Sequence, residues 1–400
     1  MGQLKINAHR LQANLISLGN IANSGEKGFT RLAYSAEEKA AAEWLKQKLA
    51  SLPVTVTQDR VGNISAKWGK LEQPAIAFGS HLDTVPEGGL FDGALGVVIG
   101  LECLETLIEA GYSPVAPLEL IGFIGEEANA LGGTFGSRAM AGLLPDSAAF
   151  TQQLQQRGFS RDDVAIARSA DEFRAFLEIH IEQGPVLEAA QQSIGVVTAI
   201  AGILRLSVEV VGSASHSGTT PMHMRKDALL DASRLVQKVY EVAAATKGEV
   251  VATVGEIAIF PNLANVVPGS ARLIIEIRGQ RWADMKQAAA DIESWAAEQL
   301  TASFRVAVEK HPITLDPGLR QAITNVCIRE NISHLAMPSG ANHDANSMSA
   351  LTKVGMIFVP SKDGLSHHPN EYTAWEEIET GANVLLQTIL SLSEQYKSQE

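Results

Sequence analysis

The sequence predicts an α/β protein with a mixed sheet flanked by helices, into which a smaller α+β ferredoxin-like domain is inserted. Three observations support this fold class. Strands alternate with helices over the first half of the chain, and polar residues collect at the carboxyl ends of those strands. Near residue 203 the pattern changes to strictly alternating, half-exposed strands. A chain of 400 residues is also long enough for two domains.

The first half of the chain contains elements that alternate as a parallel sheet requires. A helix is expected directly after Ser35, because Glu38 three residues on completes the pattern of a capping box. The run LELIGFIG is apolar throughout, as in a strand covered on both faces. The expected elements are helices over 36–50 and 94–110, the second stopped by Gly111, and strands over 74–81, 118–125 and 173–180.

The inserted domain is predicted from a second series of elements. The segment LRLSVEV (204–210) alternates apolar and polar residues, as a half-exposed strand does. The elements that follow are a helix over about 225–244, strands over 250–260 and 270–278, a helix over about 282–301 and a strand over 303–309. The order β-α-β-β-α-β is that of a ferredoxin-like unit. We therefore predict one domain formed by residues 1–203 and 313–400, and an inserted domain formed by residues 204–312.

Composition restricts the possible partners and the compartment. No apolar run approaches the roughly 18 residues of a membrane-spanning helix, and the N-terminal residues do not form a signal peptide, so a cytoplasmic protein is expected. A net charge of −13 argues against nucleic acid or anionic membranes as partners. The two cysteines, Cys103 and Cys327, lie in apolar patterns and are expected to be buried thiols.

The strand over 74–81 ends at a histidine that can bind a metal. His81 and Asp83 are two residues apart and point to the same side of a strand, so Asp83 can orient the His81 ring while the other ring nitrogen binds a metal. Asp92 follows in the glycine-rich segment GGLFDGALG, just before the next helix. An N-cap role for Asp92 is the alternative interpretation.

Two adjacent carboxylates, Glu126 and Glu127, follow the fully apolar strand. Burial of an unpaired charge is expensive, and a metal relieves that cost for one of them. The other can remain a base whose pKa is adjusted by the neighbouring charge. The alternative is an exposed acidic loop.

Two further histidines complete a candidate metal centre. His180 ends the strand over 173–180, and His367 follows a predicted strand over 355–361. Each alone is more often a structural histidine than a ligand. Together the candidate ligands are His81, Asp92, Glu127, His180 and His367. Imidazole with carboxylate and without thiolate suits Zn²⁺, Mn²⁺, Co²⁺ or Ni²⁺. One carboxylate can bridge two such ions about 3.5–4 Å apart.

The sequence resembles the M20 metallopeptidase-type amidohydrolases. The resemblance is to the branch that holds N-carbamoyl-L-amino acid hydrolases, allantoate amidohydrolases and β-ureidopropionase-like enzymes. The motifs run in family order from about residue 28, and they are GSHLDTVPEGGLFDGALGV, GEEANALGGTFGSRAMAG, HIEQGPVLE, HSGTTPM, NVVPG, PSGANHDA and DGLSHHPNE. The resemblance implies a metal-binding catalytic domain, an inserted dimerisation or lid domain, and two divalent metal ions per subunit.

The resemblance assigns a role to each member of the predicted metal centre. It implies that His81, Asp92 and His180 hold one ion, and that Asp92, Glu127 and His367 hold the other. Glu126 would be the general base. Because the family's ligand directly follows a serine, His367 is preferred over the adjacent His368, which stays open as the alternative.

The resemblance also implies residues that bind the substrate. His216, in HSGTTP, would stabilise the oxyanion in the active site of a partner subunit, so a homodimer is expected; a surface histidine without a role is the alternative. Asn265 and Arg278 resemble a clamp for the substrate carboxylate, and a guanidinium can donate two parallel hydrogen bonds to such a group. A surface salt bridge is the alternative for Arg278. The resemblance places two more residues in the substrate pocket, Gln183 and Gly340. Two others, His343 and Asp344, would contact the metal ligands and hold them in position.

The activity implied by the resemblance is metal-dependent hydrolysis of the carbamoyl amide of N-carbamoyl-L-amino acids, giving the L-amino acid, CO2 and ammonia. Allantoate or another ureido acid is the second choice of substrate, followed by N-acyl amino acids and dipeptides. One departure concerns the substrate: residues 128–133 read ANALGG, where the family has a glycine and a basic-aromatic pair. A noncatalytic relative would lack the base or a ligand, and neither is missing.

Overall fold

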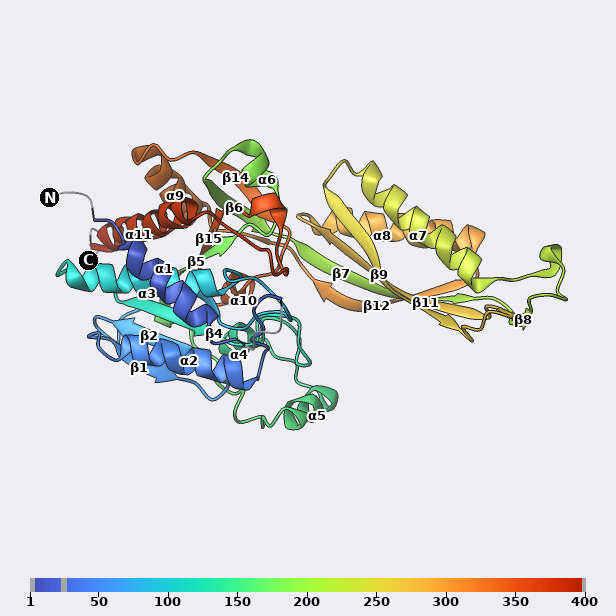
Figure 1. The fold of residues 1–400 in the computed structure, drawn as a ribbon, viewed down its shortest axis with the longest axis horizontal. Coiled ribbons are helices and arrows are strands. Elements are labelled where there is room, and N and C mark those ends of the chain that lie inside the picture. The colour runs from blue at the N-terminus through green and yellow to red at the C-terminus, as the bar shows by residue number, and fades with distance from the viewer. Residues whose placement is uncertain (1–3, 23–26, 398–400) are drawn as a thin grey trace. The chain divides into compact units, whose positions relative to one another are not determined.

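The computed structural model describes residues 4–22 and 27–397 and arranges them in two compact units. The larger unit comprises the described residues up to Thr198 and those from Leu315 onward, and the smaller unit comprises Ala199–Thr314. Figure 1 traces the chain through both units. The described residues include no helix with the length and apolar composition needed to cross a membrane.

The larger unit is built on a mixed sheet, as the sequence predicted. The sheet has nine strands, of which residues 199–200 and 313–314 fall within the bounds of the smaller unit. Their order is β1-β2-β4-β3-β5-β15-β6-β13, and β14 also pairs with β6. The pairs β4–β3, β3–β5 and β5–β15 are parallel, whereas β1–β2, β2–β4 and β15–β6 are antiparallel. The strands are β1 (Thr55–Gln58), β2 (Ile64–Trp68), β3 (Ala75–His81), β4 (Leu118–Phe123), β5 (Phe173–Ile181), β6 (Ile194–Ile200), β13 (Ile313–Thr314), β14 (His334–Ser339) and β15 (Val354–Val359).

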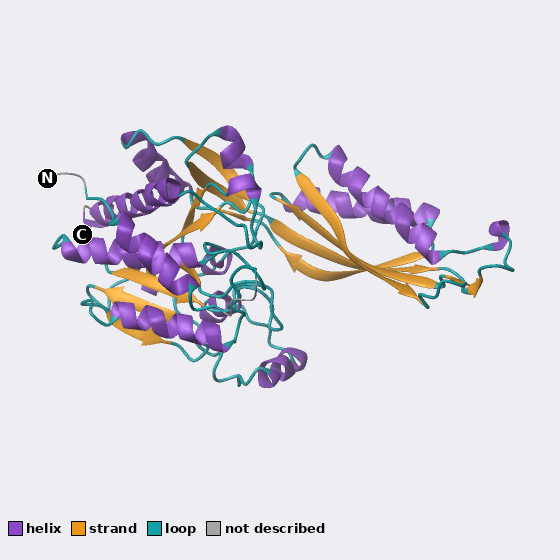
Figure 2. Ribbon diagram, viewed as in Figure 1, coloured by secondary structure: helices purple, strands orange, loops and turns teal. Residues whose placement is uncertain are grey.

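Helices lie against this sheet (Figure 2). Helix α3 packs on β3, β4 and β5 and also contacts α1 and α11, which explains why it is apolar on almost every side. Both cysteines are buried in this core, as predicted. The helices of the larger unit are α1 (Ala8–Gly19), α2 (Ala36–Leu49), α3 (Ala94–Glu109), α4 (Phe135–Met140), α5 (Ala148–Gln156), α6 (Val186–Ala190), α9 (Pro317–Arg329), α10 (Asp344–Met348) and α11 (Trp375–Lys397).

The four parallel strands bring their carboxyl ends to one edge of the sheet. In the β3–β4 ladder His81 pairs with Phe123, three residues before Glu126. In the β5–β15 ladder His180 pairs with Phe358, close to the segment that leads to His367. Residues far apart in the sequence therefore reach the same edge.

The smaller unit has its own sheet and its own hydrophobic core. The sheet order is β12-β7-β11-β9, with every pairing antiparallel. Both helices contact β11 and each other, so they cover the same face. The elements are β7 (Gly202–Val211), α7 (Ala228–Ala245), β9 (Val250–Phe260), β11 (Ser270–Gly279), α8 (Trp282–Gln299) and β12 (Ala302–Lys310). A separate two-stranded ribbon joins β8 (Ser215–His216) to β10 (Val266–Val267).

The predicted capping box at the start of α2 is formed only in part. Ser35 Oγ accepts a hydrogen bond from the Glu38 backbone N–H at 3.1 Å. The Glu38 carboxylate does not return the bond to Ser35. It accepts instead from the N–H of Tyr34 at 2.5 Å and from the N–H of Gly125 at 2.8 Å. The expectation of a reciprocal capping box was therefore wrong, because a distant backbone donor competes for the same carboxylate.

The close packing of β3 against β4 can be tested at Gly79, which lies on β3. Its φ is +154°, and an added Cβ would lie 1.8 Å from the carbonyl oxygen of Ile121 on β4. We expect Gly79→Ala to lower the free energy of unfolding by about 3 kcal/mol or more, because the strands must move apart. Urea unfolding followed by circular dichroism would measure this loss. Gly255→Ala is the control, since a Cβ there meets open space; equal midpoints for the two variants would contradict the expectation.

Candidate metal centre

The five predicted ligands lie together at the edge formed by the parallel strands. Asp92 is at the centre of the group. Its Oδ1 lies 3.5 Å from His81 Nε2 and 3.2 Å from His180 Nε2. Its Oδ2 lies 3.2 Å from His367 Nε2, which is also 3.4 Å from Glu127 Oε1. Asp92 does not cap α3, whose N-cap residue is Gly93, so the alternative role considered for it is not observed.

Backbone carbonyls orient the two buried histidines. His81 Nδ1 lies 3.0 Å from the carbonyl oxygen of Asp83, and His180 Nδ1 lies 2.9 Å from the carbonyl oxygen of Ile181. A proton held on Nδ1 by these carbonyls leaves each Nε2 directed at Asp92 as a potential ligand. Asp83 thus orients His81 mainly through its backbone, with its carboxylate farther away at 3.5 Å.

The turn that carries Glu126 and Glu127 is fixed by two other buried carboxylates. Asp83 accepts from the Glu126 N–H at 2.9 Å and from the Glu127 N–H at 3.0 Å. Glu38 accepts from the preceding N–H, that of Gly125, whose φ is +60°. Three successive backbone N–H groups therefore donate to these two carboxylates, and the Glu126 and Glu127 side chains extend from a backbone that these bonds hold in place.

Burial and charge define the state of the carboxylates. Glu126 and Glu127 are 9% and 7% exposed, so the alternative of an exposed acidic loop is excluded. Burial raises the pKa of Glu126 well above its usual value; the positive charge of His81 opposes this rise, and Glu127 adds to it. A pKa this high suits a group that must take up a proton.

Asp92 is in the opposite situation. Burial alone would raise its pKa, but the contacts with His180, His367 and His81 outweigh this effect and hold the pKa of Asp92 well below its usual value. The pKa of His367 is raised to about 10, mainly by its contact with Asp92 and next by its contact with Glu127. The carboxylates therefore create a strong preference for positive charge at this point, which a divalent cation can supply in place of protons.

The residues present fit a divalent metal ion. The ligand atoms of His81, Asp92 and His180 lie within 4.8 Å of one another, and so do those of Asp92, Glu127 and His367. Glu127 Oε1 is buried, and its contact with His367 Nε2 at 3.4 Å is an ion-pair contact without the geometry of a hydrogen bond. Such an atom is costly to bury unless a cation contacts it. The same spacing also holds for His81, Glu126 and Glu127, and for Glu178, His180 and His343.

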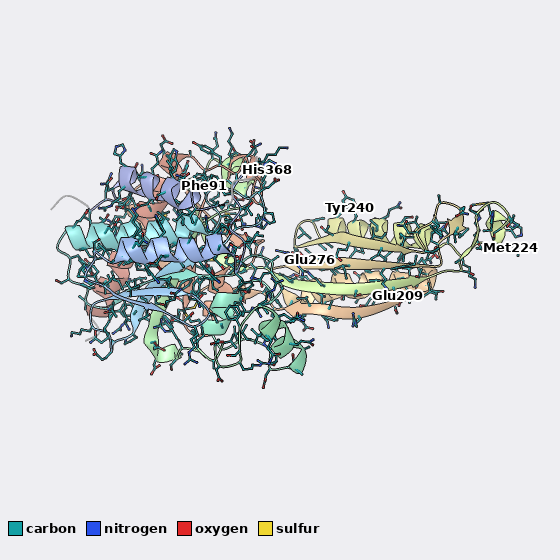
Figure 3. The ribbon with its side chains drawn as sticks, turned by 60° about the horizontal axis from the view of Figure 1, so that its bottom comes forward. Phe91, Glu209, Met224, Tyr240, Glu276 and His368 are labelled. Carbon is teal, nitrogen blue, oxygen red and sulfur yellow. The ribbon has the colours of Figure 1, made fainter. Side chains whose placement is uncertain are left out.

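The structure separates the two histidines that the sequence left as alternatives. His367 points at Asp92 and Glu127, whereas the Nδ1 of His368 accepts a hydrogen bond from the Asn370 N–H at 3.1 Å. Figure 3 shows His368 at the surface. His367 has a φ of +55°, an uncommon backbone conformation for a residue with a side chain. Strain of this kind is frequent where a side chain must be aimed precisely.

The four supporting residues predicted for the larger unit differ in their contacts and burial. Gln183 Nε2 donates to Asp92 Oδ2 at 2.9 Å, so its amide braces the central carboxylate. His343 is buried, with its Nε2 2.8 Å from Ser339 Oγ and its ring 4.7 Å from that of His180. Asp344 is fully buried, and this burial, followed by the charge of Glu178, raises its pKa well above the usual value. Gly340 is exposed, and an added Cβ there would meet open space.

The remaining predicted residues belong to the smaller unit. His216 is exposed on β8 and pairs with Val266, directly after Asn265, whose carbonyl accepts from the Ser217 N–H. Arg278 lies near the end of β11 and forms a salt bridge with Glu276 at 2.7 Å. Strand β11 begins at Ser270, next to the ribbon, and Arg278 lies eight residues further along it. At a rise of roughly 3.3 Å per residue, these two positions are about 26 Å apart. Within one chain, His216 and Asn265 are therefore close together and Arg278 is distant from both.

Sequence reasoning missed three residues of this site. Glu38 was assigned only to a helix cap, and Ser366 and Glu371 appeared only as letters of the motif SHHPNE. Ser366 Oγ lies 3.1 Å from Asp92 Oδ2 and 3.2 Å from Glu371 Oε2. Glu371 could have been noticed because it is a charged residue close in sequence to the predicted ligand His367. A carboxylate buried beside such a site needs hydrogen-bond donors or a cation.

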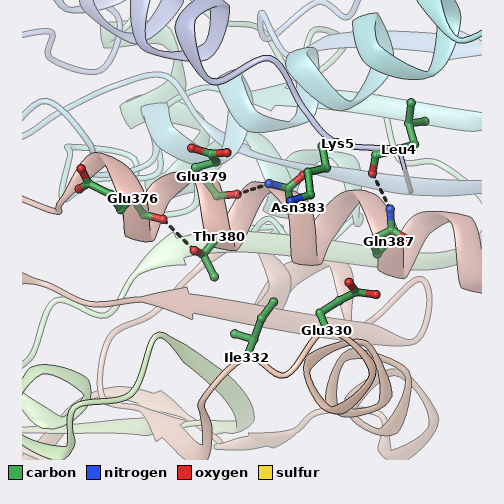
Figure 4. Close-up of a pocket in the computed structure, with 9 residues that line it drawn as sticks. All are labelled: Leu4, Lys5, Glu330, Ile332, Glu376, Glu379, Thr380, Asn383 and Gln387. Carbon is green, nitrogen blue, oxygen red and sulfur yellow. Dashed lines mark hydrogen bonds between the residues drawn. The ribbon is translucent and has the colours of Figure 1, made fainter. Parts of the chain in front are cut away.

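A separate cavity of about 340 Å³ lies between the N-terminal segment and α11 (Figure 4). It is lined by none of the predicted site residues. Two of its amides are bonded to backbone carbonyls, Asn383 to Glu379 O and Gln387 to Leu4 O. The candidate metal ligands therefore lie outside this cavity.

Comparison with known proteins agrees with this geometry. The family model "Peptidase family M20/M25/M40" matches residues 77–391. The N-carbamoyl-L-amino-acid amidohydrolase of Paenarthrobacter aurescens is 36% identical, with 97% of this chain and 98% of that protein covered. The allantoate amidohydrolase of Bacillus subtilis (strain 168) is 32% identical, with 94% and 95% covered. A solved structure, "Amidase, hydantoinase/carbamoylase family" from Burkholderia multivorans, superposes with a TM-score of 0.85 at 32% identity, covering 97% of this chain and 98% of that one. This chain therefore belongs to the M20/M25/M40 peptidase family, as a hydrolase among its amidohydrolase members.

Proposed function

We propose that this protein hydrolyses the carbamoyl amide bond of N-carbamoyl-L-amino acids, releasing the L-amino acid, CO2 and ammonia. The observation that carries the proposal is the buried Glu126 carboxylate placed beside a cluster of imidazole and carboxylate ligands. The relative from Paenarthrobacter aurescens, named as an N-carbamoyl-L-amino-acid amidohydrolase, supports this choice of substrate.

In this proposal His81, Asp92 and His180 hold one divalent ion, and Asp92, Glu127 and His367 hold the second. When bound, the ions supply an acidified water and electrophilic stabilisation of the developing oxyanion. Glu126 accepts the proton from the attacking water and delivers it to the leaving nitrogen. Its raised pKa suits both steps, because the group must be able to hold the proton between them.

Recognition of the substrate is assigned to the smaller unit and to a second chain. His216 and Asn265 lie about 26 Å along β11 from Arg278 within one chain, by the strand rise of roughly 3.3 Å per residue. One substrate the size of an amino acid cannot contact both ends. If all three residues serve a single active site, His216 and Asn265 must come from one subunit and Arg278 from its partner, as in a closed two-fold dimer.

The surface of the smaller unit is consistent with such a homodimer. Large apolar side chains are exposed on α7 and in the loop after β8, including Met222. Figure 3 shows two others, Met224 and Tyr240. Strand β9 lies at the edge of its sheet, where Val251 and Ile257 are also exposed. An apolar helix face beside an open strand edge is a surface that a second copy can cover.

Turnover of a panel of ureido acids tests the activity. Protein loaded with Zn²⁺ or Mn²⁺ is expected to release amino acid and ammonia from at least one N-carbamoyl-L-amino acid. The panel includes allantoate, because the relative from Bacillus subtilis is named for it, and N-acyl amino acids and dipeptides. Release from allantoate alone would replace the proposed substrate, and no release from any member would refute the proposal.

The role of Glu126 is tested by Glu126→Gln. The amide cannot carry a proton between water and leaving group, so kcat is expected to fall by about 10²–10⁴-fold. Bound metal, measured by elemental analysis, should stay at the wild-type level because the five ligands remain. Wild-type turnover by this variant would remove Glu126 from the mechanism.

Mixed dimers test whether His216 acts in the partner's site. His216→Ala and Arg278→Ala are each expected to lose most activity. A heterodimer of the two variants contains one site with both residues intact, so random mixing should restore about a quarter of wild-type activity. The measurement is turnover after the two variants are dissociated and reassociated together. If mixing gives no more than the average of the separate variants, His216 and Arg278 do not serve one site from different chains.

A further inference from the structure

Glu371 is a buried carboxylate outside the set of candidate ligands, with 6% of its surface exposed. Its Oε1 accepts hydrogen bonds from the backbone N–H of Phe91 at 3.0 Å and of Asp92 at 3.1 Å. Its Oε2 lies 3.2 Å from the hydroxyl of Ser366, whose one proton can be donated either to this oxygen or to Asp92 Oδ2 at 3.1 Å. One carboxylate is thus bonded both to the distant segment of Phe91 and Asp92 and to Ser366 in its own loop.

Both of these segments end in candidate metal ligands. The first carries Asp92, which faces three imidazoles and is common to both predicted ion sites. The second carries His367, directly after Ser366. Asp92 and Ser366 are 274 positions apart in the sequence, so no local structure fixes one relative to the other. Glu371 is bonded to both segments and joins them through a single side chain.

The backbone beside Glu371 leaves room for this contact. A Cβ added to Gly89 would lie 2.1 Å from Glu371 Oε1 and 2.4 Å from Glu371 Cβ. Real Cβ atoms do not approach other atoms so closely, so the carboxylate can occupy its place only because residue 89 has no side chain. Gly89 and Glu371 therefore form a matched pair, and either one can be changed to disturb the same contact.

We propose that Glu371 is a positioning residue for metal binding, which holds the Asp92 and His367 segments at the separation that two divalent ions require. The inference rests on the proposed metal centre and deepens it. Two amide donors converge on one oxygen, and a carboxylate or carbonyl oxygen has the two lone pairs needed to accept from both. Groups behind metal ligands typically affect metal affinity or activity by about 10–100-fold when removed.

The test is metal affinity, measured apart from catalysis. Metal-free wild-type protein, Glu371→Ala, Glu371→Gln and Gly89→Ala are each titrated with Zn²⁺ in competition with a chromophoric chelator. We expect about 10–100-fold weaker binding for Glu371→Ala and Gly89→Ala. Glu371→Gln should recover much of the affinity, because its carbonyl oxygen can accept from both amides and its NH2 group can donate to Ser366. Glu376→Gln, an exposed glutamate five residues on, is the matched control and should bind as wild type.

Circular dichroism and thermal unfolding of the metal-free proteins separate positioning from loss of fold. If Glu371→Ala does not fold, Gly89→Ala and Glu371→Gln decide the question. Wild-type affinity in every folded variant would overturn the inference and leave the proposed activity intact. Failure of the wild-type protein itself to bind Zn²⁺ would instead refute the proposed metal centre.

Discussion

The burial of carboxylates at one edge of the sheet is the constraint on which the rest of this site depends. Asp83, Glu38 and Glu371 are each satisfied by two backbone N–H groups. Asp92, Glu126 and Glu127 instead direct their side chains at imidazoles or at one another. The carboxylates of the first group shape the backbone, and those of the second are left to bind cations or protons, because no backbone N–H of the described residues donates to them.

Much of this arrangement could be predicted because it follows from local patterns. His81, Glu126 and His180 each end or follow an apolar strand, and parallel strands place their carboxyl ends at a common edge. The strands and helices predicted within residues 204–312 occur in the predicted order, but the ribbon of β8 and β10 was not predicted. Asp92 and His367 lie on loops, where periodicity carries no information, and only the motifs pointed to them.

The parts that could not be predicted depend on contacts between distant segments. The pattern of Ser35 and Glu38 satisfies the rule for a capping box, yet the Gly125 N–H, 87 positions away, takes the carboxylate. The salt bridge considered as the alternative for Arg278 is formed, with Glu276 as its partner. The distance of Arg278 from Asn265 follows from the length of β11 and from the ribbon that precedes it, which no local pattern in the sequence specifies.

This difference explains why the reaction class is easier to infer than the substrate. The groups that would act on the C–N bond belong to one unit, and each is held by a strand end or a buried carboxylate. Three of the groups proposed for the substrate, His216, Asn265 and Arg278, lie near opposite ends of β11 in the other unit. On the proposed function, a substitution in the first set removes the chemistry, whereas a substitution in the second set removes or alters contacts with the substrate. The same metal centre can therefore serve different substrates when the residues of the smaller unit differ.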